Sequence, residues 1–460
     1  MKKKVLTTLL AAAMVVSTLG GCGSDDGNSG SGDSSGSSSD AASDSAQASG
    51  SGEDSSADAS GDGEVVTLRI VDWESDVMND AMQDAFDNVF SVAHPNIKVE
   101  IVRGSYSDYN QSLRGMITAG EAPDVFQLGY DQACSFYRMN LLTDWAEKVA
   151  QEPEFVESFY SGTMQGWQYR GATYGFPSLV NVYGVFYNKD ILANAGLEEP
   201  KTGWTWENLW SYAETLADPS SNKYGIYGLG NSVFDIANIS TAAGGAPFIN
   251  DITDTTAVTV DDKFIEAATK RKELIANGII PQTSYDGGNQ QSMFEAGEVG
   301  MYYYGQWEID NLLRSCPDLN WGYVATPQGS AGATTTYDTV GWVSPRNLEH
   351  PEETWELMKF MSGEMYESVL KVTPVAPCAH KDYAGVFYDA VTAAGHPEAA
   401  EAVRDMMSVE TKNGVRYAAD WAGDASKVWD EGYNNFLDSK ADTDLKELAD
   451  KVNEVISANQ

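Results

Sequence analysis

The stretch VVTLRIVDWESDVMNDAMQDAFDNVFSVAHPNIKVEIV (residues 65–102) decides the fold. Apolar and polar residues alternate over Val65–Asp72 and again over Ile97–Val102, as they do in β-strands. Between them, Asp76–Phe90 has the spacing of an amphipathic helix. Its expected apolar face consists of Met78, Met82, Ala85, Phe86 and Val89. The segment therefore predicts a strand, a helix and a second strand.

The alternation of strand and helix continues downstream of this stretch. Tyr109–Ala119 has a helical pattern, and Ala122-Pro123-Asp124 precedes a short apolar strand at Val125–Leu128. This order predicts an α/β fold with a largely parallel sheet, whose ligand crevice lies at the carboxyl ends of the strands. Further along we expect a strand at Val182–Tyr187 and helices at Trp206–Leu216, Phe264–Ala276 and Leu357–Met361.

The N-terminus has the features of an export signal. Lys2–Lys4 is basic, and the apolar run Val5–Leu19 is too short for a permanent membrane span, so residues 1–21 are interpreted as a signal peptide. Leu19-Gly20-Gly21-Cys22 resembles the bacterial lipobox, in which the Cys22 thiol takes a diacylglycerol. The alternative is an ordinary signal peptide that contains a cysteine.

The segment after Cys22 is almost entirely Ser, Gly, Asp and Ala up to residue 63. Such a composition buries too little apolar surface to fold, so we expect a flexible tether. A lipidated cysteine followed by a tether favours attachment to the outer face of the cytoplasmic membrane in a Gram-positive type cell.

Composition limits the remaining functions. The chain of 460 residues has a formal net charge of −39, which repels nucleic acid and anionic headgroups. About 400 residues follow the tether, enough for two lobes, and we expect a monomer.

Cysteine and histidine give no metal or cofactor signal. Cys134, Cys316 and Cys378 form no close pair, which leaves either three buried thiols or one bridge between two of them. The four histidines lack the spacing of metal ligands, so we expect no metal and no cofactor. They are His94, His350, His380 and His396.

Several motifs occur together in one order. They are Gly120–Val125, Tyr174–Pro177, Phe186–Asp190, Trp204–Leu209 and Phe294–Met301, followed by Gly305-Gln306-Trp307. With this combination the chain resembles extracellular solute-binding protein family 1, which includes maltose- and oligosaccharide-binding components of ABC importers. The resemblance runs over nearly all of residues 65–460.

The resemblance implies a two-lobed periplasmic-binding-protein-like fold of type II, with a solute held in the cleft by hinge closure. It implies binding without catalysis, and delivery to permease subunits that work with a cytoplasmic ATPase. With the Pro/Gly-rich breaks, it indicates the following parts: residues 64–180, first part of lobe 1; 181–327, first part of lobe 2; 328–373, return to lobe 1; and 374–460, a helical part mainly in lobe 2.

Candidate contacts for a sugar combine aromatic rings with amides or carboxylates. Trp73 follows the first strand, and Tyr130 and Asp131 follow the strand at Val125–Leu128. Asp131 is either a ligand contact or a helix N-cap. Asn181 and Tyr183 lie at the first crossing between lobes.

The resemblance adds further candidates with open alternatives. Gly244 and Gly245 match a turn placed against ligand, or form an ordinary loop. Trp307 matches a stacking tryptophan, or packs in the second lobe. Trp342 faces either cleft or core. The remaining candidates are Asp420 and Trp421, with Trp429 as the alternative C-terminal aromatic, and Tyr106 and Tyr109 at the rim.

Two other classes of function compete with sugar capture. A polyamine or another cation would suit the acidic composition. A secreted hydrolase is the remote alternative, because Ser368-Val369-Leu370-Lys371 has the Ser-x-x-Lys spacing of penicillin-recognising enzymes but lacks their partner motifs.

Overall fold

The predicted βαβαβ start of the fold is confirmed. The computed structural model describes residues 65–104, 108–230, 232–282, 287–410, 412–414, 416–419, 421–438 and 443–459. Strand β1 (Val66–Asp72) lies between β2 (Ile97–Arg103) and β3 (Val125–Gly129) and pairs in parallel with both. Helix α3 (Tyr109–Ala119) connects β2 to β3.

The helix expected at Asp76–Phe90 is divided. It consists of α1 (Asp76–Ala85), the π-helical turn η1 (Phe86–Phe90) and α2 (Ser91–Ala93). Ser75 Oγ caps α1 by accepting the Met78 N–H at 3.3 Å. Four of the five expected apolar positions are buried, but Val89 is 38% exposed. The wider π turn rotates Val89 away from the face that α1 buries.

The middle of the chain contains short elements and one long strand. They are α4 (Tyr130–Arg138), α5 (Ala146–Gln151), α6 (Pro153–Glu157), η2 (Thr163–Trp167), β4 (Gln168–Tyr169), β5 (Ala172–Thr173), β6 (Phe176–Asn188), α7 (Lys189–Asn194), α8 (Trp206–Leu216), η3 (Pro219–Ser221), α9 (Val233–Ala242), α10 (Asp262–Ala276) and α11 (Gly287–Glu295). The strand expected at Val182–Tyr187 and the helices expected at Trp206–Leu216 and Phe264–Ala276 are present.

The rest of the chain adds four strands of the main sheet and most of the long helices. They are β7 (Met301–Gly305), α12 (Glu308–Ser315), β8 (Trp321–Ala325), β9 (Thr335–Val343), α13 (Pro351–Met361), α14 (Tyr366–Val372), α15 (Ala384–Ala393), α16 (Pro397–Ser408), β10 (Lys412–Asn413), α17 (Ala422–Asp438) and α18 (Leu445–Ala458).

One mixed sheet runs through the molecule in the order β2-β1-β3-β9-β6-β7, with β8 also on β6 and β10 on β9. Strand β6 is its longest member: Phe176–Val182 pairs with β9, and Tyr183–Asn188 pairs with β7 and β8. These three pairings are antiparallel, so the expected parallel arrangement holds around β1 and not around β6. Helical crossovers impose parallel pairing only where they join neighbouring strands.

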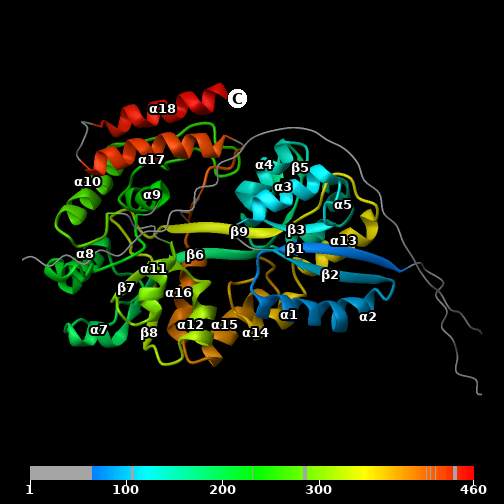
Figure 1. Cartoon of the computed structure of the whole chain (residues 1–460), viewed down its shortest axis with the longest axis horizontal. Helices are drawn as coiled ribbons and strands as arrows, with labels where there is room; N and C mark the ends of the chain where they lie inside the picture. The colour runs from blue at the N-terminus through cyan, green and yellow to red at the C-terminus, as the bar shows by residue number, and fades with distance from the viewer. Residues whose placement is uncertain are drawn as a thin grey trace, which may run out of the picture. The chain divides into compact units, whose positions relative to one another are not determined.

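Two hydrophobic clusters form the core, and the first extends from β1–β3 into Phe186, Trp321 and Tyr323 of the second lobe. The first contains Leu68, Phe126, Trp342 and Trp355, and the second contains Phe248, Phe264, Trp421 and Trp429. In Figure 1, α1, α3, α4 and α13 surround β1 to β3, whereas α8, α9, α10, α17 and α18 gather at the other end of β6 and β9. The chain is therefore a two-lobed α/β protein.

The cysteines of the described ranges are free thiols. Cys134 and Cys378 are buried, and Cys316 is partly exposed. Within the same ranges, no helix has the length and apolar character needed to cross a bilayer.

Candidate binding cleft

A cavity of about 470 Å³ lies where α4 of lobe 1 meets the second lobe, and we call it the cleft cavity. Lobe 1 contributes Asp131, the second residue of α4, whose cap position is Gly129. Most of the lining comes from the second lobe and from β9. These residues are Tyr183, Gly228, Ser232, Val233, Phe234, Asp235, Tyr303, Tyr304, Thr336, Arg416, Tyr417, Ala422, Gly423, Ser426, Trp429 and Asp430.

Aromatic rings make up much of this lining. Tyr303 lies 6.0 Å from Tyr183, measured between ring centroids, and its hydroxyl is 3.2 Å from Thr336 Oγ1. Further along the chain, Tyr417 packs edge-on against Phe234 of α9, with ring centroids 5.3 Å apart. Such rings offer flat apolar surface to a ligand.

Two buried polar groups in this lining have no partner among the described residues. They are the hydroxyl of Tyr417 and the indole N–H of Trp429, on side chains that are 2% and 1% exposed. A buried donor without an acceptor lowers stability by about 1–3 kcal/mol. Because both polar atoms are buried from solvent, a molecule in the cavity would reach them only after a local movement of the lining.

Arg416 joins the two lobes electrostatically. Its Nη1 lies 3.4 Å from Asp131 Oδ1 on α4 and 3.9 Å from Asp338 Oδ2 on β9. Burial raises the pKa of Asp338 to about 6, although Arg416 acts in the opposite direction. The guanidinium therefore offsets two carboxylates.

Gln306 connects the strands that cross between the lobes. Its Oε1 accepts the Val182 N–H at 2.7 Å, and its Nε2 donates to Asn181 Oδ1 at 2.8 Å and to the Val375 carbonyl at 3.3 Å. Gln306 is fully buried, so these bonds are shielded from water. Asn181 is thus bonded to the crossing itself, next to its β9 partner Asp338.

Trp307 and Trp73 lie outside the lining of the cleft cavity. Trp307 is partly exposed and packs edge-on against Tyr183, with centroids 5.2 Å apart. Trp73 is partly exposed and packs edge-on against Tyr109 at 4.9 Å. Trp307 therefore supports a tyrosine that lines the cavity.

Carboxylates gather near these tryptophans. Gln127 Nε2 donates to Glu74 Oε1 at 2.7 Å. Burial, together with Asp72 and Asp310, raises the pKa of Glu74 to about 7. Burial also raises the pKa of Glu308 to about 8. Asp310 belongs to α12 of the second lobe, so acidic groups of both lobes act on one another here.

Three other predicted contacts lie outside the lining of the cleft cavity. Trp342 is a core residue and not a cleft residue: it is fully buried, and its indole N–H donates to the Met361 carbonyl at 3.0 Å. Gly244 forms the turn after α9 with φ +90°, and a Cβ on Gly245 would lie 2.3 Å from Ser240 Oγ. These two glycines permit a tight turn outside the cavity lining.

Tyr130 and Trp421 lie behind the lining. Tyr130 is 3% exposed and packs closely against Gly166, where an added Cβ would lie 2.8 Å away. Trp421 is 3% exposed and supports Tyr417, with centroids 5.6 Å apart. Asp420, Tyr106 and Cys22 lie outside the described residues.

Of the predicted contacts, Asp131, Tyr183 and the alternative Trp429 line the cleft cavity. Sequence reasoning missed Arg416, Tyr417 and Asp430, and also the start of α9 at Ser232–Asp235. The run Tyr302-Tyr303-Tyr304 before Gly305 was a usable signal for Tyr303 and Tyr304. Residues 416–417 belong to no helix or strand, so periodicity gave no signal for them.

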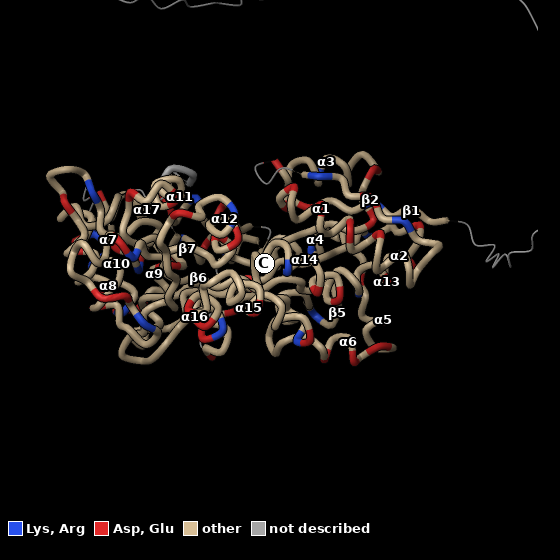
Figure 2. The backbone as a smooth tube through the Cα atoms, turned by 90° about the horizontal axis from the view of Figure 1, so that it is seen from below, with Lys and Arg blue, Asp and Glu red and all other residues tan. Residues whose placement is uncertain are grey.

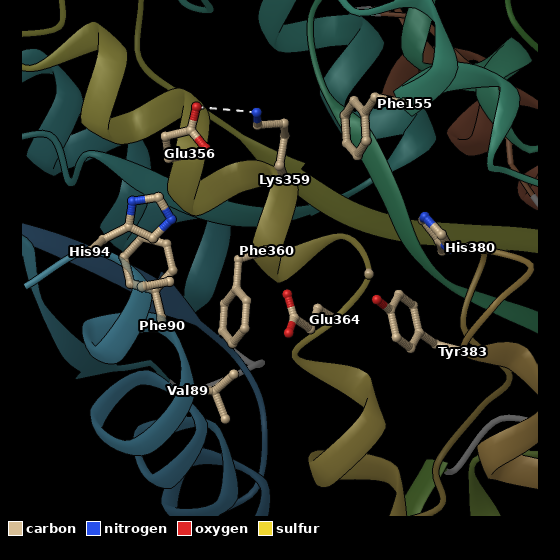
Figure 3. Close-up of a pocket in the computed structure, with 12 residues that line it drawn as sticks. Val89, Phe90, His94, Phe155, Glu356, Lys359, Phe360, Glu364, His380 and Tyr383 are labelled. Atoms are coloured by element: carbon tan, nitrogen blue, oxygen red, sulfur yellow. Dashed lines mark ion pairs between the residues drawn. The ribbon is translucent and has the colours of Figure 1, made fainter.

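A second cavity, of about 230 Å³, lies within lobe 1, and we call it the lobe 1 cavity. Figure 3 shows Phe90, Phe360 and His94 on one side of it and Phe155, His380 and Tyr383 on the other. Phe90 lies 5.2 Å from Phe360 between ring centroids. Lys359 Nζ is paired with Glu356 at 3.1 Å and with Glu152 at 2.7 Å.

The charge around both cavities is predominantly acidic. Figure 2 shows acidic positions spread over the whole described backbone, with fewer basic positions among them. The sequence has 68 Asp and Glu residues against 29 Lys and Arg residues. Within the described residues, no group of three or more His, Cys, Asp or Glu side chains is arranged to hold a metal ion.

The sequence matches the model of a known protein family. The model for the bacterial extracellular solute-binding protein family matches residues 75–367. The chain belongs to this family. Its members and structural neighbours are solute-binding proteins and not enzymes.

Solved structures of solute-binding proteins have the same fold. The Listeria monocytogenes substrate-binding protein Lmo0181, in complex with cycloalternan, has a TM-score of 0.72 at 19% identity, covering 86% of this chain and 99% of that one. The sugar-binding protein MalE of Xanthomonas citri has a TM-score of 0.68 at 18% identity, covering 86% and 98%.

Curated relatives are similar over part of their length. The maltotriose-binding protein of Pyrococcus abyssi is 29% identical over 224 residues, 46% of this chain and 44% of the relative. The galactooligosaccharide-binding protein of Bacillus subtilis is 26% identical over 269 residues, 56% of this chain and 60% of the relative. The matched region spans between 44% and 66% of the length of such relatives.

Proposed function

We propose that this solute-binding protein captures a carbohydrate of the oligosaccharide class in the cleft cavity and delivers it to the permease subunits of an ABC importer. The observation that carries the proposal is the aromatic lining of the cleft cavity, which includes Tyr183, Phe234 and Tyr303. We also propose that closure around a solute brings the buried donors of Tyr417 and Trp429 to its hydroxyl groups. Sugar hydroxyls accept such hydrogen bonds, and the C–H face of a sugar ring packs on aromatic rings. The names of the maltotriose- and galactooligosaccharide-binding relatives support the same class of solute.

Closure of the two lobes around the solute is part of the proposal. We assign the first part of lobe 1 to residues 64–180, the first part of lobe 2 to 181–327, the return to lobe 1 to 328–373 and the C-terminal helical part to 374–460. The bonds of Gln306 to Asn181, Val182 and Val375 support a hinge at these crossings. A solute favours the closed form only by the difference in its affinity for the two forms.

The N-terminal sequence supports export and anchoring. We propose that Cys22 carries the lipid, that residues 23–63 tether the two lobes, and that the protein acts as a monomer at the outer face of the cytoplasmic membrane. Replacing Cys22 with alanine should move the protein from the membrane fraction to the soluble fraction. Membrane attachment that persists in this variant would contradict lipidation at Cys22.

A thermal-shift measurement on the full chain tests the solute class. The probes are malto-oligosaccharides, galacto-oligosaccharides, spermidine and free amino acids. A ligand that binds only the native state raises the Tm, by an amount that grows with its concentration above Kd. A rise in Tm with an oligosaccharide supports the proposal. A rise with spermidine alone would show that the solute is a cation and not a carbohydrate.

A further inference from the structure

Helix α4 of lobe 1 presents one polar face to the second lobe. Asp131, Cys134 and Arg138 follow one another at spacings of three and four residues, so their side chains share one face of the helix. The helix itself is fixed to lobe 1, because Phe136 packs on Phe126 of β3 with ring centroids 6.3 Å apart. The polar face therefore moves with lobe 1.

A turn of the second lobe lies against this face. In the turn at residues 251–255, Asp251 Oδ1 accepts the N–H groups of Thr253 at 2.7 Å and of Asp254 at 3.2 Å. Ile249, just before the turn, is buried in the second hydrophobic cluster. The turn is thus held by its own hydrogen bonds and belongs to the second lobe.

Two ion pairs of opposite direction join α4 to the second lobe. In the first turn of the helix, Asp131 pairs with Arg416 at 3.4 Å. In the last turn, Arg138 Nη1 donates to Asp254 Oδ1 at 3.3 Å, and these side chains are only 18% and 31% exposed. Reversing the direction of α4 against this surface would bring like charges together. The charges therefore specify one register between the lobes.

Cys134 fills the space between the two ion pairs. Its side chain is fully buried, and its thiol donates to the carbonyls of Thr253 at 3.4 Å and of Ala418 at 3.8 Å. Burial raises the pKa of this thiol to about 11, so it is unreactive while it is covered. Separation of α4 from the turn would expose it.

We propose that this contact holds the two lobes closed around a bound solute and slows its release. We call it the α4 latch, and it consists of Asp131, Cys134 and Arg138 facing Thr253, Asp254, Arg416 and Ala418. The inference rests on the proposed closure around a carbohydrate and adds the residues that control it. Contacts made only in the closed form add to the affinity for the solute, and they act mainly on its dissociation rate.

Alkylation of Cys134 in the full chain tests the latch without any solute. Iodoacetamide is added at about pH 8, and peptide mass spectrometry resolves each cysteine. Arg138→Glu places like charges together and should speed alkylation of Cys134 about tenfold. The added Asp254→Lys restores an opposite pair and should return the rate to within about twofold of the wild type. Cys378, buried against Ser362, is the internal control and should stay protected in every folded variant.

The direct electrostatic effect of the variant has the opposite sign. Arg138 lowers the pKa of the Cys134 thiol, so its replacement by glutamate would raise that pKa and slow alkylation if the contact stayed closed. Faster alkylation of Cys134 with Cys378 still protected therefore reports separation of α4 from the turn.

Maltotriose is the solute probe for the second measurement. It should slow alkylation of Cys134 in the wild type, because it favours the closed form. Arg138→Gln should speed maltotriose dissociation about fivefold, measured by surface plasmon resonance. Lys446→Gln removes the same charge and an ion pair with Asp262 that joins α18 to α10, and should release maltotriose as the wild type does.

The outcomes separate the latch from the proposed function. Equally slow alkylation of Cys134 in the wild type and in Arg138→Glu overturns the latch and leaves carbohydrate capture standing. Equal acceleration of maltotriose release in Arg138→Gln and Lys446→Gln also overturns it. If Arg138→Glu exposes Cys134 while spermidine, and no saccharide, protects the wild type, the latch stands and the proposed carbohydrate is wrong.

Discussion

The cleft cavity and the lobe 1 cavity both combine aromatic rings with charged groups, yet their polar groups differ. In the lobe 1 cavity, Lys359 is held by Glu152 and Glu356 within 3.1 Å. In the cleft cavity, Tyr417 and Trp429 keep buried donors without partners. Unpaired buried donors lower stability, and in the proposed complex a bound solute completes the bonding of these two. The proposal therefore assigns binding to the cleft cavity and a structural role to the lobe 1 cavity.

The largest expected effect comes from removing a large aromatic side chain from each cavity. Trp429→Ala should lower the free energy of unfolding by about 3–5 kcal/mol, because Trp429 packs on Phe248 and Phe264. It should also weaken sugar binding by roughly a hundredfold, since buried tryptophans dominate binding energies. Urea unfolding and calorimetric titration measure the two effects.

Phe360→Ala is the matched control in the lobe 1 cavity. Phe360 is 7% exposed, so its removal should lower the free energy of unfolding by a similar amount, about 3–4 kcal/mol. The sugar affinity of Phe360→Ala should equal that of the wild type, measured at a temperature at which both Phe360→Ala and Trp429→Ala are folded. A loss of affinity in Phe360→Ala would show that the two cavities are not functionally separate.

An intermediate effect concerns the carboxylates that pair with the cation of each cavity. Burial raises the pKa of Asp338, the partner of Arg416, to about 6. For Glu152, burial alone would raise the pKa of the carboxyl group. The hydrogen bonds from Lys359 and Trp355 outweigh burial and lower this pKa. The stability contributions of these two carboxylates should therefore depend on pH with opposite signs.

The sign follows from proton binding. Between about pH 4 and pH 6, folded Asp338 holds its proton while the unfolded chain has released it, so its contribution to stability falls as pH rises. Asp338→Asn should therefore gain about 2 kcal/mol relative to the wild type on going from pH 4 to pH 8. Urea unfolding at the two pH values measures this difference.

Glu152→Gln should behave in the opposite way. Its lowered pKa means that Glu152 stabilises the fold above its unfolded pKa and loses this contribution as pH falls through the folded pKa. The variant should lose up to about 1 kcal/mol at pH 8, since the pair is partly exposed, and little at pH 3. Parallel pH profiles for the two variants would contradict the contrast between the cavities.

The sequence predicted the parts of the molecule that depend on local pattern. The alternation in Val65–Asp72 and the helical spacing of Trp206–Leu216 correspond to β1 and α8. The mixed pairing of β6 could not be predicted, because it joins β6 to β9 across about 150 residues of chain, and no local signal sets that register.

The candidate site was predicted less completely than the fold. Asp131 and Tyr183 were predicted because they follow or form strands with clear patterns, and both line the cleft cavity. Trp342 was ambiguous, because a tryptophan near a crossing satisfies the same pattern whether its indole bonds a ligand or, as here, the Met361 carbonyl. Arg416 and Tyr417 reach the cavity through a segment without periodicity, so only tertiary packing places them.

The smallest expected effect comes from removing one hydroxyl oxygen from each cavity. Tyr417→Phe removes a buried hydroxyl that has no partner among the described residues, so the Tm without ligand should stay the same or rise slightly. Sugar affinity should fall about tenfold, because the hydroxyl bonds the solute in the proposed complex. Tyr383→Phe makes the same change in the lobe 1 cavity and should leave affinity unaltered. If Tyr417→Phe lowered the Tm of the free protein and left affinity intact, the hydroxyl would serve the fold, and the cleft cavity would lose its main distinction from the lobe 1 cavity.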